Sequence, residues 1–343
     1  MAEGSKAKKI FGHLKSEIHM NLCANCYACM AVCPTGSIKL KGGRPVLKGR
    51  CSACGLCYDQ CPQLKSDGEI KRRIFGEMDP SVMGPYKKAY FGRANSPEIM
   101  TVAQNGGIVT CLLASLLDSG YVDGCVVMDN DSKWRPIPRV AISKEDLIEC
   151  AGRKYTPGPI LAGARDAREL YYLEEMALVG TPCQVKALRC MASDKIEARK
   201  ITNYVKLIVG LFCIKLLTYE GLFEALKDRF DISLSNVAKF DMNGERFIVY
   251  QKGGPKLELA LNELKQFSFY PCNLCKDFTA ELSDISVGGT GSPEGYSTVL
   301  TRTKVGEQAL EIGMRSGACE AELLEVDPGI EPVKKISSQK KQR

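Results

Sequence analysis

The clearest chemistry in this sequence lies in two cysteine runs of the same spacing. Each run has three cysteines separated by two residues, and a fourth cysteine after three more residues that precedes a proline. The runs consist of Cys23, Cys26, Cys29, Cys33 and Pro34, and of Cys51, Cys54, Cys57, Cys61 and Pro62. Bacterial two-cluster ferredoxins have this spacing. The chain is therefore expected to transfer single electrons.

In such ferredoxins the fourth cysteine of each run binds the other cluster. The expected ligand sets are Cys23, Cys26, Cys29 and Cys61 for one cluster, and Cys51, Cys54, Cys57 and Cys33 for the other. A zinc site usually takes its four ligands as two separated pairs, which this pattern does not resemble. Disulfides are not expected, because the start of the sequence lacks the apolar core of a signal peptide.

Four other cysteines occupy positions that favour a site. Cys183 and Cys213 each follow an expected strand, and open α/β sheets bind ligands beyond the carboxyl ends of their strands. Cys272 and Cys275 form a Cys-x2-Cys pair, so the four together could hold a third [4Fe–4S] cluster. Two structural cysteines plus a zinc or free pair remain an alternative. The other cysteines lie singly and are expected to be core or surface thiols: Cys111, Cys125, Cys150, Cys190 and Cys319.

Three glycine-containing turns lie next to expected strands or helices: 105–107, 180–182 and 288–289. The first opens an expected helix, so it would present backbone N–H groups to a phosphate or to the edge of an electron-rich ring. The others would let the backbone approach a flat ligand. A lone glycine pair is usually only a turn, but three of them indicate one shared site. Neither a Rossmann fingerprint nor a Walker A loop is present.

The elements that would position these residues fall into two expected domains. A ferredoxin domain over 21–66, with a hairpin of 37–40 and 44–47, would follow a polar leader over 1–20. A linker over 67–84 would lead to a larger domain over 85–325 and a basic tail over 326–343. In the larger domain, strands and helices alternate, which indicates an α/β architecture. Strands are expected at 88–93, 124–128, 176–179, 205–212 and 284–287, and helices at 108–117, 184–191 and 218–230.

Composition fits a globular protein of two or three domains, with 343 residues, of which 45% are hydrophobic and 25% charged. The longest uncharged apolar run, 207–214, is too short to cross a bilayer. Much of the net charge of +7 lies at the two ends, which are expected to be solvated. No nucleic-acid recognition motif accompanies this charge. From residue 41 onward there is no histidine, which argues against a hydrolytic site built on one.

Five sequence blocks of the larger domain resemble the coenzyme F420 hydrogenase/dehydrogenase beta-subunit family. The blocks are 104–110, 154–156, 179–184, 271–278 and 284–288. The likeness covers residues of about 85 to 310. It implies a flavoprotein that binds FAD and one [4Fe–4S] cluster and that exchanges hydride with coenzyme F420. It also implies that Cys183, Cys213, Cys272 and Cys275 ligate that cluster.

The resemblance further implies which residues line the FAD. With the two glycines of the last turn, the expected cofactor-binding residues are Asn105, Gly106, Gly107, Ile108, Thr110, Lys154, Tyr155, Thr156, Gly180, Thr181, Pro182, Gly288 and Gly289. The implied reaction is hydride transfer from reduced F420 to FAD N5, followed by single electrons through the clusters, with no catalytic side chain. Arg153, Lys186 and Lys215 are candidates for the coenzyme entrance, with ordinary surface positions as the alternative.

A ferredoxin fused in front is similar to the input subunit of the F420H2 dehydrogenases of methanogenic and related archaea. The implied partner is a membrane-bound complex that reduces methanophenazine or a quinone, docking near the ferredoxin domain. Soluble hydrogenase, heterodisulfide reductase, formate dehydrogenase and sulfite reductase partners stay open, as do F420 reduction and a relay without F420 binding. The expected location is the cytoplasm or, through a partner complex, the inner face of the cell membrane.

Overall fold

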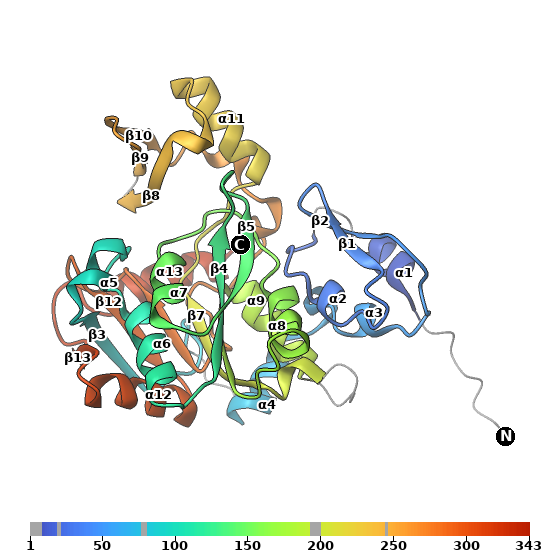
Figure 1. Ribbon diagram of the computed structural model, residues 1–343, viewed down its shortest axis with the longest axis horizontal. Coiled ribbons are helices and arrows are strands. Elements are labelled where there is room, and N and C mark those ends of the chain that lie inside the picture. Colours follow the sequence, from blue (N-terminus) through green and yellow to red (C-terminus); the bar gives the residue numbers. More distant parts are fainter. Residues whose placement is uncertain (1–8, 19–21, 77–80, 193–199, 244–245) are drawn as a thin grey trace.

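The structure, a computed structural model, describes residues 9–18, 22–76, 81–192, 200–243 and 246–343. It consists of an N-terminal ferredoxin domain, drawn in blue at the right of Figure 1, and a larger α/β domain. This confirms the mixed fold class expected from the sequence. Among the described residues, no helix is long and apolar enough to cross a membrane.

The ferredoxin domain is built from short elements around the cysteine runs. Its elements are α1 (Phe11–Glu17), α2 (Ala28–Ala31), β1 (Ile38–Lys41), β2 (Arg44–Leu47), α3 (Leu56–Asp59) and the 3₁₀ turn η1 (Pro62–Leu64). The expected hairpin is present, because β1 and β2 pair antiparallel. Gly42 and Gly43 turn the chain with φ of 54° and 66°, a region that glycine enters at little cost.

Helix α1 corrects the expectation of a solvated leader. Phe11, Leu14 and Ile18 are buried and pack in one cluster with Ile38 and Cys57 of the ferredoxin domain. His13 is exposed, whereas His19 lies outside the described residues. The apolar side chains of α1 lie three and four residues apart, on one face of the helix, which explains why this short segment is ordered against the domain.

An eight-stranded sheet forms the centre of the larger domain, in the order β13-β3-β12-β11-β7-β6-β4-β5. The strands are β3 (Lys88–Ala94), β4 (Gly124–Asn130), β5 (Pro136–Ala141), β6 (Met176–Gly180), β7 (Val205–Leu211), β11 (Ile285–Gly288), β12 (Ser297–Thr301) and β13 (Cys319–Leu323). Strands β11, β7, β6 and β4 run parallel, and the outer strands pair antiparallel. All five strands expected from the sequence are present.

Helices cover both faces of this sheet. Along β6, Met176 and Leu178 face one apolar core, whereas Ala177 and Val179 face the other. Side chains alternate between the faces of a strand, so burial on both faces produces the continuous apolar run seen in the sequence. The helices of this domain are α5 (Pro97–Val102), α6 (Ile108–Asp118), α7 (Lys144–Glu149), α8 (Ile160–Glu169), α9 (Pro182–Met191) and α12 (Lys304–Arg315).

A smaller antiparallel sheet lies beyond the parallel strands, at the top of Figure 1. It contains β8 (Val237–Asn243), β9 (Arg246–Gln251) and β10 (Lys256–Ala260), with α11 (Tyr219–Phe230) and the 3₁₀ turns η2 (Leu234–Asn236), η3 (Lys265–Phe267) and η4 (Tyr270–Asn273) nearby. Its own apolar core includes Tyr155 from the larger domain. Only α11 of this subdomain was expected from the sequence.

Two segments expected to be a linker and a tail are helical and packed. In α4 (Asp67–Phe75), Ile70 is buried in the same core as residues of α9. In α13 (Glu331–Lys341), Val333 and Lys340 are buried. The prediction of a solvated tail is therefore wrong for these residues, because α13 places one face against the larger domain. The domain boundaries themselves stay predictions.

Candidate functional site

A cavity of about 260 Å³ lies at the carboxyl ends of β4, β6, β7 and β11. Parallel strands of an open sheet end at one edge, which is where ligands usually bind. Ten of the residues predicted to hold a cofactor line this cavity: Asn105, Gly107, Ile108, Thr110, Lys154, Tyr155, Thr156, Gly180, Thr181 and Gly288. Gly106, Pro182 and Gly289 are not among its lining residues.

Some of the predicted glycines are required by the protein itself. A side chain at Gly106 would lie 2.4 Å from the backbone oxygen of Gly92, and one at Gly289 would lie 2.6 Å from Oδ1 of Asn105. Gly107 precedes α6 with φ of 67°, which other residues rarely adopt. The open approach that the sequence suggested at Gly106 and Gly289 is thus occupied by neighbouring protein atoms.

Lys154 and Tyr155 organise one wall of the cavity. Nζ of Lys154 donates to the backbone oxygens of Ala151 and Gly152 at 3.0 and 3.1 Å, and to that of Cys150. Burial lowers the pKa of Lys154. These bonds hold the turn that follows α7, so Lys154 shapes the wall through its backbone contacts.

The hydroxyl of Tyr155 is the buried polar atom of this wall that lacks a regular hydrogen bond. The ring packs edge-on against Phe247, with centroids 5.1 Å apart. Burial raises the pKa of Tyr155 to about 12, and the nearby Arg153 opposes this rise. Arg153 lies close enough to act on this hydroxyl, so the two side chains together offer polar groups to a ligand in the cavity.

The small sheet is tied to the mouth of the cavity. Nε2 of Gln104 donates to Oδ1 of Asp241 on β8, and Nη2 of Arg153 donates to Oδ1 of Asn105 at 3.4 Å. Arg153 and Lys215 line the cavity, and their role at a coenzyme entrance stays a prediction.

Lys186 lies elsewhere, and its assignment to the entrance is corrected. Its Nζ forms an ion pair with Asp67 of α4 at 2.5 Å and donates to the backbone oxygen of Lys65. The side chain therefore joins α9 to the segment that leaves the ferredoxin domain.

The structure brings Cys183, Cys213, Cys272 and Cys275 together beside the cavity. Burial raises the pKa of Cys183 to about 12, with smaller contributions from Cys275 and Cys272. Cys213 lines the cavity. Burial raises its pKa, and the other three cysteines of the set raise it further. Thr181 links the two features, because it lines the cavity and its Oγ1 lies 3.3 Å from Sγ of Cys183. Cluster binding by this set stays a prediction.

The ferredoxin cysteines also gather in two sets. Burial raises the pKa of Cys26, and the nearby thiols of Cys61, Cys23 and Cys29 raise it further. The structure thus brings the last cysteine of the second run to the first run.

The other set contains the fourth cysteine of the first run. Burial raises the pKa of Cys57 to about 12, and the nearby thiols of Cys54, Cys33 and Cys51 contribute to this rise. Cys51 is exposed, whereas Cys26 is buried, so the second set lies closer to solvent. In the described part of the chain, no three Cys, His, Asp or Glu side chains are grouped to hold a single metal ion.

Helix α9 connects the third cysteine set with the ferredoxin domain. Cys183 lies in its first turn and Cys190 in its last turn. Burial raises the pKa of Cys61 to about 11, and Cys190 adds a smaller contribution, which places Cys190 within electrostatic range of Cys61. The sequence marked Cys190 only as an ordinary thiol; its place near the end of a helix that begins at Cys183 was the available signal.

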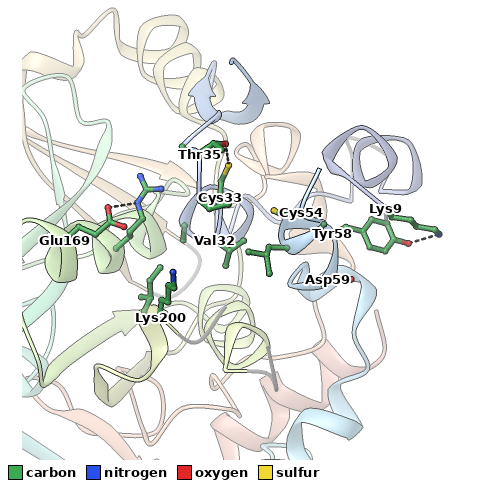
Figure 2. A pocket seen from close by; sticks show the side chains of 16 residues that line it. Lys9, Val32, Cys33, Thr35, Cys54, Tyr58, Asp59, Glu169 and Lys200 are labelled. Atoms are coloured by element: carbon green, nitrogen blue, oxygen red, sulfur yellow. Dashed lines mark hydrogen bonds and ion pairs between the residues drawn. The ribbon is translucent and has the colours of Figure 1, made fainter. Parts of the chain in front are cut away.

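A second cavity, of about 960 Å³, lies between the ferredoxin domain and α8. Figure 2 shows Cys33 and Cys54 on its ferredoxin side, with Glu169 and Lys200 opposite. Nη1 of Arg165 on α8 donates to the backbone oxygen of Met30 at 3.3 Å, which fastens the two parts next to this cavity.

Comparisons with known proteins identify the family of this chain. Residues 89–163 and 173–327 match models of the coenzyme F420 hydrogenase/dehydrogenase beta subunit, N-term and C terminus, and residues 16–39 match a 4Fe-4S binding domain. The coenzyme F420 hydrogenase subunit beta of Methanothermobacter thermautotrophicus is 35% identical over 76% of this chain and 94% of the relative. The chain belongs to the coenzyme F420 hydrogenase/dehydrogenase beta-subunit family.

Two further relatives are informative. A subunit of the F420H2 dehydrogenase of Methanosarcina mazei is 28% identical, and the match covers 94% of this chain and 90% of the relative. A solved chain of the F420-reducing [NiFe] hydrogenase complex from Methanosarcina barkeri superposes with a TM-score of 0.73 at 32% identity, covering 78% of this chain and 92% of that chain. The chain is thus an F420-related oxidoreductase subunit that carries a 4Fe-4S ferredoxin domain.

Proposed function

We propose that this chain oxidises reduced coenzyme F420 with FAD and passes the electrons singly to a partner complex. The observation that carries the proposal is the contact between the cavity and the third cysteine set: Cys213 lines the cavity, and the lining residue Thr181 contacts Cys183. A flavin site that accepts two electrons must lie close to a cluster that carries one electron, because the electrons pass directly between them. The ferredoxin domain then supplies the route towards a partner.

The residues around the cavity fit the ring-bearing part of a flavin. Its volume lies just below the range of about 300–1,000 Å³ typical of ligand sites, and aliphatic side chains such as Ile108 and Leu211 contribute to its lining. The hydroxyl of Tyr155 offers an unsatisfied hydrogen-bonding group, and the first turn of α6 offers backbone N–H groups. Bound FAD would accept hydride at N5 and release electrons one at a time.

The cysteine sets would hold three [4Fe–4S] clusters, each carrying one electron. The third set would use Cys183, Cys213, Cys272 and Cys275. Cys183 and Cys190 are seven residues apart on α9, which corresponds to about 10 Å along a helix axis. Since Cys190 lies within electrostatic range of Cys61, the helix fixes the separation of the third set from the first ferredoxin set.

The second ferredoxin set is the proposed exit. Cys51 is exposed, and the cavity of Figure 2 adjoins Cys33 and Cys54. A partner that docks on this surface would come close to the last cysteine set. Arg153 and Lys215 are proposed to receive the acidic tail of F420, because they line the first cavity.

Two partner classes are supported by different relatives. The F420H2 dehydrogenase relative matches nearly the whole chain, which favours a membrane-bound complex that reduces methanophenazine or a quinone. The hydrogenase relative is more similar but covers 76% of the chain, which favours a soluble F420-linked complex as the second candidate.

The test uses anaerobically purified protein reconstituted with iron, sulfide and FAD. Reduced F420 and a one-electron dye are added, and the absorbance of oxidised F420 is followed. Turnover that disappears when FAD is left out supports the proposal. No turnover at full loading would contradict it and favour a relay without F420 binding. Iron analysis tests the third set separately, because three clusters require about twelve irons and two require about eight.

A further inference from the structure

The C-terminal helix places a buried lysine against the third cysteine set. Lys340 is 2% exposed. Its Nζ donates to Sγ of Cys275 at 3.4 Å and to the backbone oxygens of Cys213 and Asp277 at 2.6 Å each. An ammonium group has three donors, so all of them are used here. Two of the acceptors belong to cysteines of the set.

No described carboxylate forms an ion pair with Lys340, but the buried carboxyl of Asp277 lies within electrostatic range of its charge. The carboxylate of Glu281 forms ion pairs with Lys71 and Lys341 instead. Burying a charged group is costly even beside one partly compensating carboxyl, so such a group normally has a specific task. The direct contact of Nζ with Sγ of Cys275 means that this cation would stabilise negative charge on the cysteine sulfurs.

Neighbouring contacts fix Lys340 in place. Lys341 binds the buried Glu281, and Nη1 of Arg343 donates to the backbone oxygens of Cys272 and Ile214 at 3.0 and 3.2 Å. The end of α13 is thus attached to both segments that carry the cysteines. A mobile surface lysine could not maintain such contacts at a fixed distance from the sulfurs.

We propose that Lys340 raises the reduction potential of the cluster held by Cys183, Cys213, Cys272 and Cys275. This inference rests on the proposed function, because it requires a cluster at this set. A cluster held there would accept one electron from a bound flavin and pass one electron to the ferredoxin domain, while Lys340 keeps its protons. The reduced cluster carries one more negative charge. A fixed cation and an N–H bond to a ligand sulfur stabilise that state.

Lys340 is thus a positioning residue for electron transfer, since it touches the ligands and not the substrate. By raising the potential, it makes the third cluster a better acceptor from the flavin. A purely structural role would predict a change in stability without a change in potential. The potential is therefore the measurement that separates the two roles.

The experiment is a redox titration of the reconstituted holoprotein followed by electron paramagnetic resonance. The variants are Lys340→Met, which removes charge and donors, and Lys340→Gln, which removes the charge but keeps an N–H donor. Lys335→Gln is the matched control, because Lys335 is exposed on the same helix and loses the same charge. The two ferredoxin clusters in the same sample serve as internal references.

Both Lys340 variants are expected to shift the midpoint of the third cluster to more negative values. An about tenfold change in the ratio of oxidised to reduced cluster at a given potential corresponds to roughly 59 mV for a one-electron couple. The Lys335→Gln control and the ferredoxin clusters are expected to keep their midpoints.

The outcomes separate this inference from the proposed function. Wild-type protein with about eight irons would remove the third cluster and with it the proposed function. About twelve irons with unchanged midpoints in both variants would overturn the role of Lys340 alone. Loss of the cluster from both variants would also overturn it, because Lys340 would then be needed to retain the cluster and not to set its potential.

Discussion

The ferredoxin cysteines and the third cysteine set are brought together in two different ways. The ferredoxin sets come from 39 consecutive positions, Cys23–Cys61, and one of their thiols is exposed. The third set is assembled from Cys183, Cys213 and the 272–275 pair, at the end of a buried sheet and under the C-terminal helix. The first arrangement is local and close to solvent, whereas the second depends on the tertiary fold.

This difference suggests different tasks. A local motif near the surface can exchange electrons with a partner, as we propose for the second ferredoxin set. A set of half-buried cysteines that α9 and α13 contact can be adjusted by residues from distant parts of the chain. Hydrogen bonds, charge and solvent exposure control the potential of such clusters. Four changes test this contrast.

Replacing Cys183 with Ser is expected to have the largest effect. The third cluster should be lost, leaving about eight irons, while both ferredoxin clusters assemble. Reduced F420 should then fail to reduce the ferredoxin clusters, with a rate at least about 100-fold below wild type, because their nearest donor is missing. Stopped-flow absorbance and electron paramagnetic resonance measure this reduction.

Cys125→Ser is the matched control for that variant. Cys125 is also a buried thiol of the larger domain, on β4, but it is not part of any proposed ligand set. It should keep about twelve irons and a rate close to wild type. Equal losses in both variants would show that the domain tolerates no buried cysteine replacement and would remove the argument for a special role of Cys183.

The second test concerns the ion pairs that join distant segments. The carboxylate of Glu281 is 2% exposed and binds Lys71 of α4 and Lys341 of α13, which lie 210 and 60 residues away. Glu281→Gln should lower the free energy of unfolding by about 3 kcal/mol, at the lower end for a buried pair because both lysines can still reach water. Denaturant titration measures this difference.

Glu331→Gln provides the comparison, since Glu331 pairs with Lys334 on the exposed face of α13. Exposed pairs of this kind contribute about 0.5 kcal/mol or less. If the Glu281 variant is no less stable than this control, α4 and α13 are attached mainly by apolar packing.

The sequence predicted local features well and distant ones poorly. Cysteine spacing predicted both ferredoxin runs, and apolar runs such as 176–179 predicted the parallel strands, because both depend on neighbouring residues. It placed Lys340 in a solvated tail and gave no signal for Glu281. Their burial arises from contacts with segments far away in the chain, and no short-range pattern records such contacts. The ten cavity residues were predicted with intermediate success. The glycine turns indicated a shared site, but only the family resemblance named the full set of residues.

The third test returns to the hydroxyl of Tyr155. Removing it as Tyr155→Phe should weaken FAD binding about fivefold, because a typical hydrogen bond contributes about 1 kcal/mol. Without FAD, the variant should be as stable as wild type or slightly more so, since the buried hydroxyl has no regular partner. Titration of the cofactor-free protein with FAD measures the affinity.

Tyr171→Phe is the matched control, because it removes the same hydroxyl from a tyrosine outside the site. Tyr171 is exposed and does not line the cavity, so its replacement should leave FAD binding unchanged. An FAD affinity of the Tyr155 variant equal to wild type would place the cofactor away from this wall of the cavity.

The smallest expected effect is at a local carboxylate, Asp146, whose partners lie within seven residues. It accepts hydrogen bonds from the backbone of Ile142 and from Arg139. Burial raises the pKa of Asp146, but these bonds outweigh it, so the pKa is lowered overall from its usual 3.8. Asp146→Asn should cost about 0.5 kcal/mol near neutral pH, since the side chain is partly exposed.

The sign of the pH dependence follows from the lowered pKa. The folded state favours the charged carboxylate, so the stabilisation is fully present above the unfolded pKa of about 3.9 and is lost as the pH falls through the folded value. Wild type and Asp146→Asn should therefore converge in stability under acid conditions and differ above about pH 5. A difference that grows on acidification would contradict the local hydrogen bonds as its cause. Because this contribution is small and local, it marks the lower limit against which the long-range contacts of Glu281 are compared.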